Sequence, residues 1–225
     1  RLIWPFPLGN IYNRLLGLIL NKFDLIITIN ELNKKIIEKM TFKKVRIIPN
    51  DVDIMKLKIP EKESEPRLVF IGRLHWQKRI IQMIKWLNHK NIPIKNLLII
   101  GDGPQFSLIN KLSKNILNIN VHLTGWLTQK EQIEILRRND ILIINSIIEG
   151  DPLVVSESLS RGIKCISRNI KSVKTILHED YLFNSQKDLI KILNNMINEN
   201  PDIYFRKNKL IINNRNKQIQ NIVSE

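Results

Sequence analysis

The sequence predicts an α/β fold in which helices cover both faces of a parallel sheet. From about residue 67, short apolar segments alternate with amphipathic segments of helical length, which is the pattern of such a sheet. The 225 residues, 43% of them hydrophobic, suffice to bury a core. The longest apolar candidate for a membrane span, 11–29, is interrupted by Arg14, Lys22 and Asp24, so we expect no transmembrane helix.

The first sixty residues have a different pattern from the part of the chain that begins near residue 67. They predict helices at 11–21 and 31–40 and strands at 24–29 and 45–48. The segment 49–66 is rich in proline and charge and has no periodicity, which is typical of a linker. The sequence therefore predicts a first unit at 1–48, followed by a linker at 49–66.

The main domain is predicted at 67–200. Its expected strands are 67–71, 96–100, 121–124, 141–145 and 164–167. Its expected helices are 77–90, 104–114, 129–138, 152–161, a short one near 173–177, and 186–198. After Pro201, the polar and basic residues 201–225 predict a helical tail.

The helix at 152–161 has the strongest boundary signals. Asp151 is a good N-cap residue, Pro152 suits the first turn, and Gly162 suits the exit from the helix. We therefore expect this helix to begin directly after the loop that follows strand 141–145.

The chain carries a formal net charge of +15 and a pI near 10.0. Its positive residues are spread along the sequence, alanine is absent, and Ile, Asn and Lys are abundant. A compositional bias of this kind raises the charge without any functional demand, and an anionic membrane surface or other anionic partner is a second explanation. Because the basic residues form no tract, we expect no nucleic-acid partner.

The single cysteine, Cys165, lies in a predicted buried strand. No disulfide is therefore expected, which fits a reducing cytoplasm. The four histidines, His75, His89, His122 and His178, are dispersed without metal-ligand spacing, so we expect no metal site. The chain begins with Arg1 and shows no signal-peptide pattern, and we expect it to begin within a longer protein.

Candidate binding residues follow the predicted strands, where doubly wound sheets bind ligands. Gly72 and Arg73 close strand 67–71, and Lys78 lies in the first turn of the next predicted helix. A cation is disfavoured there unless an anion compensates it. Arg73 and Lys78 therefore form a candidate diphosphate clamp, and a solvated basic turn is the alternative interpretation.

A second candidate loop is the segment 101–104, with the sequence GDGP, after strand 96–100. Its two glycines allow close approach of the backbone, as glycine-rich turns do beneath nucleotides. An ordinary turn before a helix explains the same residues equally well.

Two carboxylates follow strand 141–145. Glu149 lies in the loop and Glu157 on the second turn of the next helix, and carboxylates accept hydrogen bonds from sugar hydroxyls. The amides of Leu153 and Val154 stand at the helix start, where an anion meets N–H donors and a positive dipole. The alternative is a capped surface helix with two solvated acids.

Taken together and in order, these motifs resemble the retaining glycosyltransferases of family four, which have the GT-B fold. The segments that carry the resemblance are 49–53, 70–79, 99–104, 121–126 and 145–162. The resemblance implies two Rossmann-like domains facing across a cleft. On that basis 67–200 is the nucleotide-sugar donor domain and 1–48 is the end of the acceptor domain.

The resemblance also implies roles for the candidate residues. Arg73 and Lys78 would bind the donor diphosphate and support its departure, and Glu157 would hold the ribose hydroxyls. Glu149 would contact the transferred sugar. The implied chemistry is transfer of a hexose from a UDP- or GDP-sugar to an acceptor hydroxyl with retention, without cofactor or metal.

Backbone groups would complete the donor site. By the same resemblance, the turns near Gly103 and Leu127 would meet the base, with Gly72 beside the phosphates. The amides of Leu153 and Val154 would add donors to those phosphates.

The chain departs from the family pattern in several places. Arg79 and Asp51 stand where glycine is usual, and Ser158 stands where alanine is usual. Asp151 brings a negative charge near the expected phosphate site, and 171–176 lacks the usual glycines.

The leading hypothesis is a hexosyltransferase of surface polysaccharide, lipopolysaccharide or lipid-linked glycan assembly. The expected partners are a nucleotide-sugar donor and a glycan or lipid-linked acceptor, and the expected location is cytoplasmic, including the inner face of the membrane. A non-catalytic nucleotide-sugar-binding remnant or partner subunit is the alternative.

Overall fold

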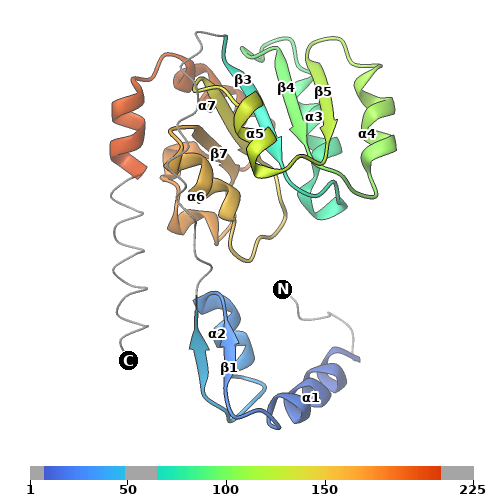
Figure 1. Cartoon of the computed structure of the whole chain (residues 1–225), viewed down its shortest axis with the longest axis vertical. Helices are drawn as coiled ribbons and strands as arrows, with labels where there is room; N and C mark the ends of the chain where they lie inside the picture. Colours follow the sequence, from blue (N-terminus) through green and yellow to red (C-terminus); the bar gives the residue numbers. More distant parts are fainter. Residues whose placement is uncertain (1–7, 49–64, 209–225) are drawn as a thin grey trace. The chain divides into compact units, whose positions relative to one another are not determined.

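The computed structural model describes residues 8–48 and 65–208 (Figure 1). These residues belong to two compact units, 8–48 and 65–208. Most of the predicted linker at 49–66 and of the tail at 201–225 lies outside the described residues. The domain boundaries proposed from the sequence therefore stay a prediction.

The smaller unit contains two helices and two short parallel strands. In chain order these are α1 (Leu8–Leu20), β1 (Ile26–Thr28), α2 (Glu31–Ile37) and β2 (Val45–Ile47). The Asn30 side chain accepts a hydrogen bond from the amide of Asn33 at 2.8 Å and caps α2. All four elements predicted from the sequence are present, and most of their ends shift by a few residues.

The smaller unit does not bury its apolar side chains completely. Several large apolar side chains of α1 are more than half exposed: Ile11, Tyr12, Leu15, Leu18 and Ile19. Their spacing places them along one side of the helix. The described part of this unit therefore has only a small core, which includes Ile26, Val45 and Ile47.

The larger unit is built on a six-stranded parallel sheet with the order β5-β4-β3-β6-β7-β8. Its strands are β3 (Arg67–Ile71), β4 (Asn96–Ile100), β5 (Asn120–Gly125), β6 (Asp140–Ile144), β7 (Lys164–Arg168) and β8 (Leu182–Phe183). The residues of β3, β4, β6 and β7 are almost all buried or half-buried. Because both faces of these strands are covered, they appear in the sequence as continuous apolar runs.

Besides the helical residues 201–208, five helices of the larger unit accompany the sheet. They are α3 (Ile80–Leu87), α4 (Phe106–Ser113), α5 (Gln129–Ile135), α6 (Leu153–Ser160) and α7 (Gln186–Ile197). Right-handed crossovers place α3 and α4 on one face and α5 and α6 on the other, and Figure 1 shows α5 and α6 in front of the sheet. The predicted parallel α/β fold with helices on both faces is therefore confirmed.

The helix predicted at 77–90 is divided by a left-handed residue. A single 3₁₀ turn, Trp76–Lys78, ends at Arg79, whose φ and ψ are 51° and 38°, and α3 begins at Ile80. Lys78 thus lies in a separate turn before α3 and not in its first turn. Glycine adopts this backbone conformation without steric strain, whereas arginine does not.

The predicted N-cap of α6 was also wrong by one residue. The capping position is occupied by Pro152, which makes no side-chain capping bond, and the carbonyl of Asp151 accepts a hydrogen bond from the Leu153 amide at 2.9 Å. The Leu153 amide is therefore engaged within the chain.

The sheet ends in a segment that the sequence patterns did not resolve. The helix predicted near 173–177 is a 3₁₀ turn, Val173–Thr175, and a second 3₁₀ turn, Glu179–Tyr181, leads into β8. With only two residues, β8 is too short for a recognisable alternation of apolar and polar side chains.

Tyr204 fastens the helical residues 201–208 to the sheet. Its side chain is fully buried, and its hydroxyl accepts a hydrogen bond from the Cys165 amide at 2.6 Å and donates one to the Cys165 carbonyl at 2.9 Å. β8 pairs only with Ser167 and Arg168 of β7. The tyrosine hydroxyl therefore satisfies strand groups that β8 does not reach.

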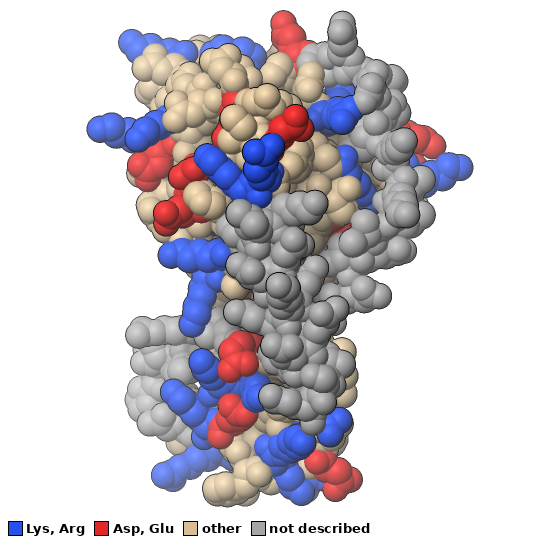
Figure 2. Space-filling model, turned by 90° about the vertical axis from the view of Figure 1, so that its left-hand side faces the viewer, with Lys and Arg blue, Asp and Glu red and all other residues tan. Residues whose placement is uncertain are grey.

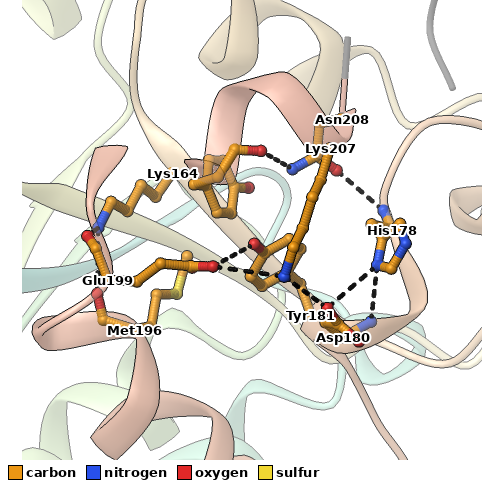
Figure 3. Close-up of polar contacts among 9 residues, drawn as sticks. Lys164, His178, Asp180, Tyr181, Met196, Glu199, Lys207 and Asn208 are labelled. Carbon is orange, nitrogen blue, oxygen red and sulfur yellow. Dashed lines mark hydrogen bonds and ion pairs between the residues drawn. The ribbon is translucent and has the colours of Figure 1, made fainter. Parts of the chain in front are cut away.

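Polar contacts hold the same segment from the outside (Figure 3). Lys207 Nζ lies 2.7 Å from Asp180 and 3.6 Å from Glu199, and the Tyr181 hydroxyl donates to Glu199 at 2.8 Å. Lys164 Nζ donates to two carbonyls at the end of α7, those of Met196 and Glu199. Residues 201–208 thus pack against the rest of the larger unit.

At the amino ends of the strands, a buried ion pair joins β3 to β6. Arg67 donates to both carboxylate oxygens of Asp140, at 3.0 and 2.8 Å, and the side chain of Asp140 is fully buried. The two-bond geometry fixes the relative position of these strands.

We predict that Tyr204→Phe lowers the free energy of unfolding of the larger unit by about 1–3 kcal/mol, because two buried backbone groups lose their partner. Denaturant unfolding monitored by circular dichroism measures the change. Tyr12→Phe is the control, since Tyr12 is 59% exposed and should change stability by less than about 0.5 kcal/mol. Equal stability of Tyr204→Phe and the parent chain would contradict this role.

Candidate nucleotide-sugar site

The strand order identifies one point of the sheet as the expected ligand crevice. From β3 the chain proceeds outward through β4 to β5, then returns to the other side of β3 as β6 and proceeds through β7 to β8. In open α/β sheets, ligands bind beyond the carboxyl ends of the strands at such a reversal. The loops after β3 and β6 are therefore the expected location of a ligand site.

Backbone and side-chain hydrogen bonds join these two loops. The Ile147 amide donates to the Gln77 carbonyl at 2.9 Å, and Asn145 Nδ2 donates to the Arg79 carbonyl at 3.1 Å. Asn145 is fully buried. The 3₁₀ turn after β3 is thus fixed by the loop that follows β6.

The same loops bring together two residues singled out from the sequence. Lys78 Nζ donates to Glu149 Oε1 at 2.6 Å although the residues are 71 positions apart. Ser146 Oγ donates to the same oxygen. The two charged side chains are 27% and 14% exposed, so this ion pair is partly shielded from solvent.

Arg73 and Glu157 stand on the neighbouring elements without joining this pair. Arg73 is exposed just after β3, and Glu157 is half-buried on α6. Within residues 8–48 and 65–208, neither charged group makes a hydrogen bond or an ion pair. Both side chains are therefore available to a ligand, and their predicted roles remain predictions.

The glycines of the segment 101–104 allow two loops to approach closely. A Cβ atom on Gly101 would lie 1.9 Å from the Gly72 carbonyl oxygen, and one on Gly103 would lie 2.7 Å from that of Leu74. The Leu74 amide donates to the Asp102 carbonyl at 2.8 Å. These glycines are thus required by the contact between the loops after β3 and β4, whatever ligand binds above them.

The backbone groups expected near the base already have partners in the chain. The Gly103 amide donates to Asp102 Oδ1 at 2.6 Å, and the Leu127 carbonyl accepts from Gln132 Nε2 at 2.9 Å. A base at these turns would use other backbone atoms or displace those bonds.

Sequence reasoning missed the residues that support the ion pair. Asn145 and Ser146 directly follow the apolar strand β6 and are both fully buried. Two polar residues at the end of an apolar run were the available signal. Arg168 at the end of β7 was missed as well; burial, together with the charge of Arg79, lowers the pKa of its guanidinium.

The surface charge shows no concentration on the face drawn in Figure 2. Lys and Arg side chains are scattered there and alternate with acidic ones. Across the described parts of the chain, His, Cys, Asp and Glu form no group of three or more that could hold a metal. The described helices include none that is long and apolar enough to span a bilayer.

Comparison with known proteins identifies the family of this chain. The family described as glycosyl transferases group 1 matches residues 51–217. An uncharacterized glycosyltransferase of Methanocaldococcus jannaschii is 36% identical over 172 residues, which are 66% of this chain and 40% of that protein.

A second relative has a named reaction. The UDP-Gal:alpha-D-GlcNAc-diphosphoundecaprenol alpha-1,3-galactosyltransferase of Escherichia coli is 28% identical over 159 residues, which are 61% of this chain and 40% of that protein. The chain therefore spans about two fifths of the length of these curated relatives.

The fold is shared with a solved glycosyltransferase. The structure of the lipopolysaccharide outer core galactosyltransferase WaaB, in its apo form, has a TM-score of 0.63 at 21% identity and covers 87% of this chain and 62% of its own. This likeness confirms the GT-B fold class. The chain belongs to the glycosyltransferase group 1 family.

Proposed function

We propose that this chain binds a nucleotide-sugar donor as part of a hexosyltransferase. The enzyme would transfer a hexose from a UDP- or GDP-sugar to an acceptor hydroxyl with retention of anomeric configuration. The observation that carries the proposal is the meeting of Lys78 and Glu149 at the point where the strand order reverses.

The charges at this point suit both ends of a sugar diphosphate. Arg73 and Lys78 would neutralise the phosphate oxygens and stabilise the nucleoside diphosphate as it leaves. Glu149, held by Lys78 and Ser146, would accept hydrogen bonds from hydroxyls of the transferred sugar. The two functions are coupled because Lys78 contacts the sugar-binding acid directly.

Glu157 and the start of α6 would bind the remainder of the donor. A carboxylate on the second turn of a helix can accept both hydroxyls of a ribose, and Glu157 has no competing partner among the described residues. The amide of Val154, near the amino end of α6, would add a phosphate donor.

The relatives support the pathway part of the proposal. The Escherichia coli protein takes its sugar from UDP-galactose and its acceptor is a lipid diphosphate sugar, as its name states. By analogy we propose a glycan or lipid-linked acceptor in surface polysaccharide or lipid-linked glycan assembly for this chain. No metal or organic cofactor enters the proposed reaction.

One prediction from the proposed function concerns binding of the donor diphosphate. The chain should bind UDP or GDP, and Arg73→Ala or Lys78→Ala should weaken that binding by about 10- to 100-fold, because a charge-assisted hydrogen bond is lost. Isothermal titration calorimetry measures the dissociation constants. Glu157→Ala should weaken binding of UDP relative to that of pyrophosphate, which has no ribose.

Lys95→Ala is the matched control, because Lys95 is exposed just before β4, at the opposite end of the sheet. It removes one positive charge and should leave the affinity unchanged. If the folded chain binds no nucleoside diphosphate at millimolar concentration, the proposal is wrong.

Another prediction separates phosphate binding by Lys78 from sugar binding by Glu149. Glu149→Gln removes the charge that holds Lys78, so UDP, which has no sugar, should bind as tightly as to the parent chain or more tightly. The affinity gained on adding the sugar, measured as the ratio of the dissociation constants of UDP and the matching UDP-sugar, should fall. A loss of UDP affinity in Glu149→Gln would instead assign Glu149 a structural role.

A further inference from the structure

Two arginines near the Lys78–Glu149 ion pair have no assigned role in the proposed donor site. Arg79 precedes α3 and Arg168 ends β7. Both are half-buried, and within the described parts of the chain neither guanidinium makes a hydrogen bond or an ion pair. A partly buried arginine normally has a carboxylate or carbonyl partner.

The backbone places the two arginines together. Ile144 of β6 is in register with Ser167 of β7, so Asn145 and Arg168 directly follow this pair at the carboxyl ends of the two neighbouring strands. Asn145 Nδ2 in turn donates to the Arg79 carbonyl at 3.1 Å. Asn145 thus links the two positions, and the charge of Arg79 contributes to the lowered pKa of Arg168.

Two further features mark this place as unusual. Arg79 is the one non-glycine residue with positive φ in the described parts of the chain, a strained conformation for a residue with a side chain. Asn145 is fully buried, and its Oδ1 has no hydrogen-bond partner among the described residues. Strained backbone conformations cluster at active sites and ligand-binding sites, and an unpaired buried polar atom calls for a functional or structural explanation.

The negative charge of Glu149 does not compensate the two arginines, because that carboxylate is held by Lys78 and Ser146. Guanidinium groups bind carboxylate and phosphate oxygens through paired hydrogen bonds. The position beyond the carboxyl ends of β6 and β7 is on the ligand side of the sheet.

We propose that Arg79 and Arg168 form a second anion subsite, which binds a carboxylate or phosphate group of a substrate in addition to the donor diphosphate. This inference rests on the proposed function for the identity of the first site. The extra anion belongs either to the donor sugar, as the carboxylate of a uronic acid, or to the acceptor, as a phosphate.

The test is calorimetric titration of the whole chain with UDP, UDP-glucose and UDP-glucuronate, and with pyrophosphate after saturation with UDP. If the donor carries the anion, UDP-glucuronate should bind about 10-fold more tightly than UDP-glucose. If the acceptor carries it, both sugars should bind alike and pyrophosphate should bind to the UDP-saturated chain.

Arg79→Gly and Arg168→Gln should each abolish the effect that is observed and leave the affinity for UDP within about two-fold, a difference below 1 kcal/mol. Arg79→Gly should not lower the melting temperature, because glycine adopts the left-handed conformation without strain. Arg137→Gln is the control, since Arg137 is equally half-buried but precedes the amino end of β6.

Absence of both effects, or their survival in both variants, would overturn the inference. A loss of UDP affinity in the variants would overturn it too, since the pair would then be part of the diphosphate site. If UDP itself does not bind, the proposed function fails, and pyrophosphate titration of the nucleotide-free chain and of both variants still decides whether the arginines bind an anion.

Discussion

The candidate site depends on the hydrogen bonds that join the loop after β3 to the loop after β6. Three contacts make this connection: the Ile147 amide with Gln77, the Asn145 side chain with Arg79, and Lys78 with Glu149. Without them, the short 3₁₀ turn at 76–78 would have little to hold it, because it buries no residue of its own. The cation and the acid are thus positioned by hydrogen bonds within the chain that need no ligand.

The loops on the other side of β3 follow the same principle. Gly101 and Gly103 leave no room for a side chain, and the backbones of 72–74 and 101–105 bond directly to one another. These bonds, together with the contacts to the loop after β6, connect the three loops on which the expected ligand would lie. Preorganised charges of this kind act without rearrangement when charge develops on a leaving group.

The sequence was sufficient for the fold because the strands of the larger unit are buried on both faces. β3 and β4 were predicted with the observed ends, since uninterrupted apolar runs bounded by polar residues leave little choice. The failures occurred where the backbone was decided by contacts distant in the sequence. The helix at 77–90 is broken at Arg79, β8 is too short to show a pattern, and the helix start at Pro152 depends on its loop.

Of the four charged residues singled out from the sequence, the structure joins two, Lys78 and Glu149, by a direct contact. The family pattern identified Arg73, Lys78, Glu149 and Glu157, but the direct contact of Lys78 with Glu149 spans 71 residues and follows only from the strand order. Ser146 donates to Glu149, and Asn145 donates to the Arg79 carbonyl. The burial of these two residues could not be predicted from the sequence, because a polar residue after a strand can be either solvated or buried. The nearness of Arg79 and Arg168 likewise required the register of β6 and β7.

The bonds of Tyr204 to Cys165 have a consequence for the chain during its synthesis. Until residue 204 has left the ribosome, the amide and carbonyl of Cys165 have no partner, and the first half of β7 is an open strand edge. Such edges pair readily with other nascent chains. A single phenolic oxygen, supplied 39 residues later, therefore caps the part of this strand edge that β8 does not cover.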